Sequence, residues 1–148
     1  METTQDRARD FARLGFGEGW RWEKGSWWLE PGQSAEVRAF AAVAIAQGAR
    51  FVAITASERV DGEIRLDYQW DLDGQLLSYT AQTREKKIAS IVDLLPAADW
   101  AERETCEYFA VEFTGRKAPE TLMLRRGDPV GLHLRGSSDG GKERGAAQ

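Results

Sequence analysis

The sequence contains very few residues that could bind a metal ion or form a disulfide. One cysteine and one histidine occur among its 148 residues, so no intramolecular disulfide can form. The same count excludes the usual ligand sets of structural zinc and of iron–sulfur clusters. Cys106 falls inside a predicted helix and is interpreted as a packed thiol, and His133 is interpreted as a surface or interface residue. The composition therefore predicts a chain with no metal and no other cofactor.

Long apolar runs and an excess of positive charge are absent as well. No run of about 18 apolar residues occurs, so the chain is not expected to cross a membrane by itself. Residues 1–10 are polar and lack the apolar centre of a signal peptide. The formal net charge of −4 and the isoelectric point near 5.1 argue against binding of nucleic acid by bulk charge. These features predict a mildly acidic cytoplasmic domain with no nucleic-acid partner.

Sequence signals divide the chain into three parts. Residues 1–33 are predicted to hold a short helix and a hairpin, residues 34–126 an α+β domain, and residues 127–148 an irregular, disordered tail. The elements predicted before the central sheet are a helix over residues 4–14, paired strands at Trp20–Glu23 and Ser26–Glu30, and a helix that Ser34 caps and that runs to about Gln47. That last helix is apolar nearly all round, which is typical of a helix packed against a sheet.

The clearest element is a strand at Ile64–Leu72, in which apolar and polar residues alternate. Asp73-Gly74 follows, the preferred dipeptide of a two-residue hairpin turn, and Gln75–Thr83 is the returning strand. A two-residue loop fixes the register and places Trp70 opposite Leu77. The large apolar residues of both strands then fall on one face, so turn chemistry and alternation agree.

The segments on either side of this hairpin give weaker signals. A strand is predicted at Phe51–Ala56, and its poor register with Ile64–Leu72 predicts a longer loop or a bulge near Ser57–Glu63, or else a central strand buried on both faces. Further on, Ser90 is predicted to cap a short helix that runs through Leu95 and ends at Pro96. Asp99 is predicted to cap the next helix, which runs to about Phe109, with Glu102 completing a capping box. Together the elements predict an α+β fold, a mostly antiparallel sheet with helices packed on one face.

The helix over residues 99–109 is the segment most able to carry a function, and three interpretations are open. It is a solvated helix end whose acidic first turn favours the helix dipole. It is an acid–base site that uses Glu102, Glu104 or Glu107. Or it is a partner-binding helix whose arginine and glutamates form desolvated pairs across an interface. A basic patch of Arg116, Lys117, Arg125 and Arg126 follows Gly115.

The helix and the residues after it carry a recognisable pattern. Its members are Trp100, Glu102, Arg103, Glu104, Glu107, Phe109, Val111, Phe113 and Gly115. At this spacing the segment resembles the signature of the C-subunit family of NADH-quinone oxidoreductase (complex I), and the resemblance extends over about residues 34–126. Ala110 stands where the family has glycine, and Arg116-Lys117 stand where it has His-Pro. These departures indicate closer similarity to the small subunit of membrane-bound, energy-converting nickel–iron hydrogenases.

The resemblance implies a cofactor-free structural and assembly subunit that performs no catalysis on its own. It implies docking against the large catalytic subunit, next to an iron–sulfur subunit, at the cytoplasmic (inner) face of the membrane, with membrane contact only through the complex. The partner interface expected from it comprises Trp100, Glu102, Arg103, Glu104, Glu107, Phe109, Phe113, Arg116, Arg125 and Arg126. If these residues form an interface, their charged groups should be poorly satisfied within the chain itself.

Two other functions remain open at the level of the sequence. One is a stand-alone enzyme that uses the glutamate-rich helix for acid–base chemistry. The other is a small α+β binding module, for which the six tryptophans would be suited. An RNA-binding version of that module would use the aromatic residues of the hairpin at Trp20–Trp28. The acidic balance of charge weighs against RNA.

Overall fold

The computed structural model describes residue 16 and residues 19–31 and 36–136. Its elements are β1 (Arg21–Glu23), β2 (Ser26–Leu29), α2 (Val37–Ala46), β3 (Arg50–Glu58), β4 (Ile64–Leu72), β5 (Gln75–Thr83), β6 (Lys87–Ala89), the 3₁₀ helix η2 (Pro96–Ala98), α3 (Asp99–Phe109) and β7 (Glu112–Thr114). The predicted helix over residues 4–14 and the predicted cap at Ser34 lie outside the described residues.

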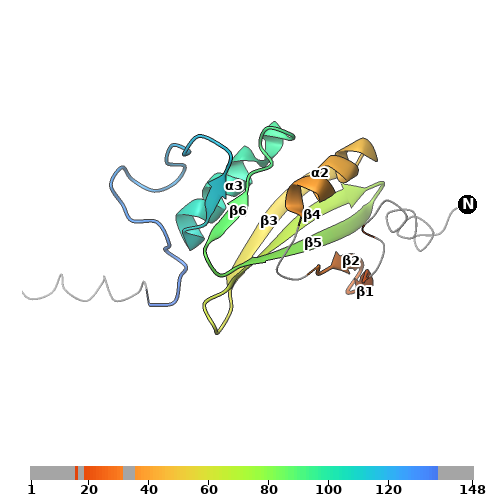
Figure 1. Ribbon diagram of the computed structural model, residues 1–148, viewed down its shortest axis with the longest axis horizontal. Helices are drawn as coiled ribbons and strands as arrows, with labels where there is room; N and C mark the ends of the chain where they lie inside the picture. The colour runs from red at the N-terminus through yellow and green to blue at the C-terminus, as the bar shows by residue number, and fades with distance from the viewer. Residues whose placement is uncertain (1–15, 17–18, 32–35, 137–148) are drawn as a thin grey trace, which may run out of the picture.

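Five strands form one sheet in the order β1-β2-β5-β4-β3. All neighbours in it are antiparallel except β2 and β5, which run parallel. The two α-helices of the described residues lie over one face of this sheet, α2 over its middle and α3 beside β3 (Figure 1). The predicted α+β class, with a mostly antiparallel sheet and helices on one face, is confirmed. The parallel pairing of β2 with β5 had no signal in the sequence.

The β4–β5 hairpin has the predicted register. Trp70 lies opposite Leu77, and Leu72 lies opposite Gln75 across the Asp73-Gly74 turn. Trp70 is only 1% exposed, and its ring meets the Phe40 ring of α2 at 6.2 Å between centroids. The alternation therefore buries one face of the hairpin under α2, which is the centre of the hydrophobic core.

β3 is longer than predicted and lies at the edge of the sheet, not at its centre. A loop of five residues from Arg59 to Glu63 joins it to β4, so the prediction of a longer loop is confirmed. The register also shifts between Phe51 and Ala53, which places the irregularity at the start of β3. The five-residue loop sets Ile54 opposite Tyr68, and the one-residue shift then sets Phe51 opposite Trp70.

The segment between β6 and α3 differs from the prediction. Ser90–Leu95 forms a single turn and no helix, because Leu95 is extended, as a residue before proline prefers to be. Pro96 starts a 3₁₀ helix and does not end an element. Asp99 is the first residue of α3 and not its cap, and no side chain caps this helix. The predicted capping box is wrong because the carboxylates of Asp99 and Glu102 bind elsewhere.

Residues 127–136 contain no helix or strand, but they bond to α3. The backbone N–H of Gly131 donates to the carbonyl of Glu107 at 2.7 Å, and that of His133 donates to the carbonyl of Tyr108 at 2.8 Å. The backbone therefore stays bonded to the rest of the fold as far as Arg135, whose N–H donates to the Glu58 carboxylate. Among the described residues, no helix is long and apolar enough to span a membrane.

Candidate functional site: the α3 clamp

α3 turns an unusual face toward the rest of the chain. Its buried residues are Glu102, Thr105 and Glu107. Two of these three carry a carboxylate, where a helix packed on a sheet normally buries apolar side chains. Buried carboxylates require hydrogen-bond donors around them, and the donors come from segments on both sides of α3 in the sequence.

Glu102 connects α3 to the turn after β6. Its Oε2 atom accepts hydrogen bonds from the Ser90 hydroxyl at 2.7 Å and from an Arg116 guanidinium nitrogen at 2.9 Å. Its Oε1 atom accepts the backbone N–H of Ile91 at 2.8 Å. With its residue only 1% exposed, this carboxylate is fully surrounded by groups of its own chain.

Glu107 binds residues 122–124, which follow Arg116 and Lys117 in the chain. Its carboxylate accepts the backbone N–H groups of three consecutive residues, Leu122, Met123 at 2.9 Å and Leu124 at 3.3 Å. Burial by itself would raise the pKa of the Glu107 carboxyl, but the three N–H donors outweigh it and hold that pKa below its ordinary value. The negative form of the side chain therefore fastens residues 122–124 to α3.

Two arginines complete the arrangement around Asp99. Arg116 reaches one carboxylate oxygen of Asp99 at 2.5 Å, and Arg103 reaches the other at 3.4 Å. Arg103 also donates to the backbone carbonyls of Glu120 at 3.2 Å and Thr121 at 3.1 Å. The hydrogen bond from Arg116 is the main reason that the pKa of Asp99 lies below its ordinary value.

We call Asp99, Glu102, Arg103, Glu107 and Arg116 the α3 clamp. The expectation that these charged groups are poorly satisfied within the chain is wrong, because each binds backbone or side-chain groups of segments 90–91, 99–107 and 116–124. The sequence could not show this, since the donors to Glu102 and Glu107 lie 11–17 residues away and are mostly main-chain groups. The sequence prediction includes Asp99 only as a helix cap and not as a site residue, although its spacing of four from Arg103 indicates an ion pair.

The other residues of the expected interface lie around the clamp. Phe113 is buried in the core and Phe109 packs against it. Trp100 is 61% exposed, while Glu104 lines a cavity between α3 and β3. Arg125 and Arg126 are exposed on the segment beyond residue 124, and the structure does not bring them to the clamp.

The cavity between α3 and β3 has a volume of about 420 Å³. Its lining is Ile54, Thr55, Ala56, Glu104, Thr105, Tyr108, Phe109 and His133. The centroid of the His133 ring lies 4.4 Å from that of the Tyr108 ring, so the segment 127–136 forms one wall of the cavity. Cys106 has no part in this lining, and burial raises the pKa of its thiol, as expected for a packed cysteine.

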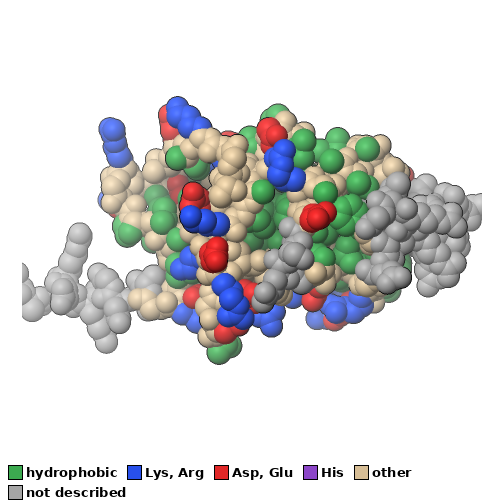
Figure 2. Space-filling view, in the orientation of Figure 1, with side chains coloured by type: hydrophobic (Ala, Val, Ile, Leu, Met, Phe, Trp, Pro, Cys, Tyr) green, Lys and Arg blue, Asp and Glu red, His purple; other side chains and the backbone are tan. Residues whose placement is uncertain are grey.

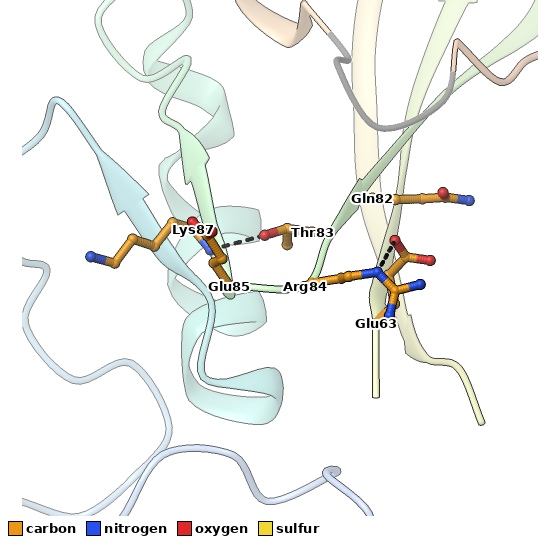
Figure 3. A pocket seen from close by; sticks show the side chains of 6 residues that line it. All are labelled: Glu63, Gln82, Thr83, Arg84, Glu85 and Lys87. Atoms are coloured by element: carbon orange, nitrogen blue, oxygen red, sulfur yellow. Dashed lines mark hydrogen bonds and ion pairs between the residues drawn. The ribbon is translucent and has the colours of Figure 1, made fainter. Parts of the chain in front are cut away.

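A second, polar hollow of about 320 Å³ lies where β5 leaves the sheet (Figure 3). Its Arg84 side chain points toward Glu63, with 3.7 Å between the closest charged atoms. The backbone N–H of Lys87 donates to the Thr83 hydroxyl at 3.1 Å on its other side. None of the expected site residues reaches this hollow. Within the described ranges no group of three or more metal-ligating side chains occurs.

Comparison with known proteins places this geometry in a family. The family model of the respiratory-chain NADH dehydrogenase 30 kDa subunit matches residues 32–142, which include the whole α3 clamp. The chain belongs to this family. Members of the 30 kDa subunit family work within a multi-subunit complex of the complex I type, so the resemblance expected from the residues around α3 is confirmed.

A solved structure has the same fold as this chain. A trypsin-resistant fragment of Nqo5 superimposes with a TM-score of 0.61 at 18% sequence identity, covering 79% of this chain and 100% of that chain. At that identity the likeness concerns the fold alone. Comparison with curated proteins gives no match.

Proposed function

We propose that this chain is a cofactor-free structural and assembly subunit that docks against the large catalytic subunit of a membrane-associated oxidoreductase. Its neighbours are that large subunit and an iron–sulfur subunit, and the complex holds it at the cytoplasmic face of the membrane. The proposal extends the family membership from a complex I-type subunit to a role within the complex. We further propose the energy-converting nickel–iron hydrogenase type, since Arg116 occupies the position of the family's histidine and is bound to Asp99 and Glu102.

The observation that carries the proposal is that the charged residues of the motif bind groups of their own chain. The clamp fixes residues 116–124 on α3 through main-chain bonds, which is what a rigid docking surface requires. Trp100 and Met123 then stand exposed on this surface, and exposed tryptophan is typical of an interface anchor. In the proposed interface, Trp100, Glu104, Phe109, Arg125 and Arg126 contact the partner. Glu102, Arg103, Glu107, Phe113 and Arg116 position them.

The acid–base alternative has less support. A catalytic carboxylate must reach its substrate, and Glu102 and Glu107 are both buried against donors of their own chain. Glu104 lines a cavity together with His133, but the His133 ring packs against the rings of Tyr108 and Phe109. The RNA-binding alternative rests on the β1–β2 hairpin, where the positive charge beside the exposed Trp22 is that of Arg21. Arg21 is ion-paired with Glu23 and Glu30, so this charge is already used within the chain and is less suited to a phosphate backbone.

Co-purification tests the proposal with two matched tryptophan variants. The full chain is co-expressed with the affinity-tagged large subunit of its complex, and the yield of bound chain is measured. We expect Trp100→Ala to lower this yield at least about tenfold. Trp22 is an exposed tryptophan on β1, at the far side of the sheet, so Trp22→Ala should leave the yield unchanged. Both variants should melt near the wild-type temperature. Equal yields for all three proteins, or no capture of the wild-type chain, would contradict the proposal.

A further inference from the structure

The two edges of the five-stranded sheet are built differently. β1 is three residues long and exposes Arg21 and Glu23, two features that discourage another strand from pairing with it. β3 is nine residues long, and between Arg50 and Glu58 it carries seven uncharged residues, Phe51–Ser57, without proline. A long, uncharged edge strand of this kind is a template for a further strand.

The open side of β3 has unused hydrogen-bonding groups. β3 pairs with β4 along its length, and in the described part of the chain no strand lies on its other side. In an antiparallel pair, alternate residues direct their N–H and C=O groups away from the partner. About half of the backbone groups of β3 therefore point to the open edge, and only an extended backbone can satisfy them in a row.

A groove runs along this edge and restricts what can bind. The cavity of about 420 Å³ joins Ile54, Thr55 and Ala56 of β3 to Tyr108 and Phe109 of α3. These walls favour apolar side chains, while Glu104 adds one carboxylate and the His133 ring beside Tyr108 forms a further wall. The groove is also continuous with the proposed docking surface, because Glu104 and Phe109 belong to both.

We propose that β3 and this groove bind an extended segment of the partner subunit, which adds to the sheet as a sixth strand. The side chains that this segment turns toward α3 are apolar, with a lysine or arginine opposite Glu104. The inference rests on the proposed function, because it supplies a second contact with the same partner. It adds the mode of binding, in which main-chain hydrogen bonds give affinity and the groove gives specificity.

A second copy of this chain is the competing occupant. Antiparallel self-pairing centred on Ile54 would set Arg50 of one copy opposite Glu58 of the other, a favourable charge match. Both charges already have partners in their own chain, however. Arg50 lies 3.0 Å from the Asp71 carboxylate, and the Glu58 carboxylate accepts the backbone N–H of Arg135 at 2.5 Å. The apolar groove with its single acid favours the heterologous segment.

Amide hydrogen exchange of the full chain, alone and in the purified complex, tests the proposal. Alternate amides within Phe51–Ser57 should exchange quickly in the isolated chain and at least about 100-fold more slowly in the complex. Amides of β1 should not change. A complex that forms while these β3 amides stay fast would overturn the added strand and leave the proposed function intact. Protection that depends on the concentration of the isolated chain would replace the proposal with self-pairing.

A charged substitution at the edge gives the second measurement. Thr55→Lys places a lysine on the exposed edge strand, and Val60→Lys places one at the tip of the β3–β4 loop, where Val60 is 90% exposed. We expect Thr55→Lys to lower co-purification at least about tenfold at an unchanged melting temperature, and Val60→Lys to have no effect. Loss with both variants, or with neither, would overturn the proposal. If the tagged large subunit does not capture the wild-type chain, the proposed function is wrong instead.

Discussion

The two halves of the molecule are held together by different forces. In the sheet core, Phe40 of α2 stacks on Tyr79 at 4.3 Å between centroids and meets Trp70 at 6.2 Å. In the α3 clamp, carboxylates and guanidiniums bind main-chain groups of the surrounding segments. On the face drawn in Figure 2, apolar side chains gather over α2 and the sheet, while charged side chains of both signs lie on the side of α3 and along the lower edge.

This difference has consequences for stability. Apolar burial depends little on pH or salt, and losing it leaves a cavity. The clamp depends on ionised groups, so removing one partner leaves a buried charge, while removing both together costs much less. We therefore expect acid to open the clamp half first, whereas the most costly single substitutions are expected in the sheet core.

The largest effect is expected in the sheet core. Trp70→Ala should lower the free energy of unfolding by about 3–5 kcal/mol, because it empties a large fully buried site under α2. Trp22→Ala on β1, which is exposed, should change it by less than about 1 kcal/mol. Urea unfolding measures both, and Trp70→Phe serves as the milder variant if Trp70→Ala does not fold. A small effect for both Trp70 variants would mean that the core does not centre on this hairpin.

The next effect concerns the guanidinium of the clamp. Arg116→Met should lower the free energy of unfolding by about 3 kcal/mol, because it leaves the buried Glu102 carboxylate without its charge partner. Adding Glu102→Gln to Arg116→Met should recover part of that loss, since no buried charge then remains. Arg125→Met, at an exposed arginine, is the control. A double variant less stable than Arg116→Met alone would show that the pair contributes net stability.

Acid should open the clamp half first. The pKa of Glu107 is lower in the folded chain than in the unfolded chain, so its stabilisation is full above the ordinary carboxyl value of about 4.3 and is lost as the pH falls below it. Asp99 acts in the same direction. We expect the amides of Leu122–Leu124 to lose exchange protection below about pH 4, while those of β4 stay protected. In Glu107→Gln their protection should be weaker and less dependent on pH, and a wild-type profile in this variant would contradict the assignment.

The same division explains how much the sequence could predict. The β4–β5 hairpin depends on local information, a turn dipeptide and an alternation that agree, and its register was predicted correctly. The clamp depends on contacts between α3 and main-chain groups 11–17 residues distant. In the sequence, Glu102 and Glu107 fit a solvated helix end, an acid–base site or a partner-binding helix, and nothing local indicates that their carboxylates bind groups of their own chain. The edge position of β3 was missed for a similar reason, because nothing local distinguishes an edge strand from a central one.

The smallest effect is expected at the end of α3, where the chain departs from the family's glycine. Ala110 has a φ of 56° and donates its N–H to the Cys106 carbonyl at 2.9 Å. An L-residue in this left-handed conformation costs roughly 1–2 kcal/mol, and glycine removes that cost but gains about 0.4–1 kcal/mol of entropy in the unfolded chain.

Ala110→Gly should therefore raise the free energy of unfolding by about 0.5 kcal/mol, a shift of a few degrees in melting temperature. Ala42→Gly, at an exposed position inside α2, is the matched control and should lower it by about 0.5–1 kcal/mol. Because the effect is confined to the last turn of α3, it should appear as slower exchange of the Ala110 and Gly131 amides, with β4 unchanged. Equal destabilisation by both glycines would mean that the methyl group of Ala110 contributes more by packing beside Gly131 than the left-handed backbone costs.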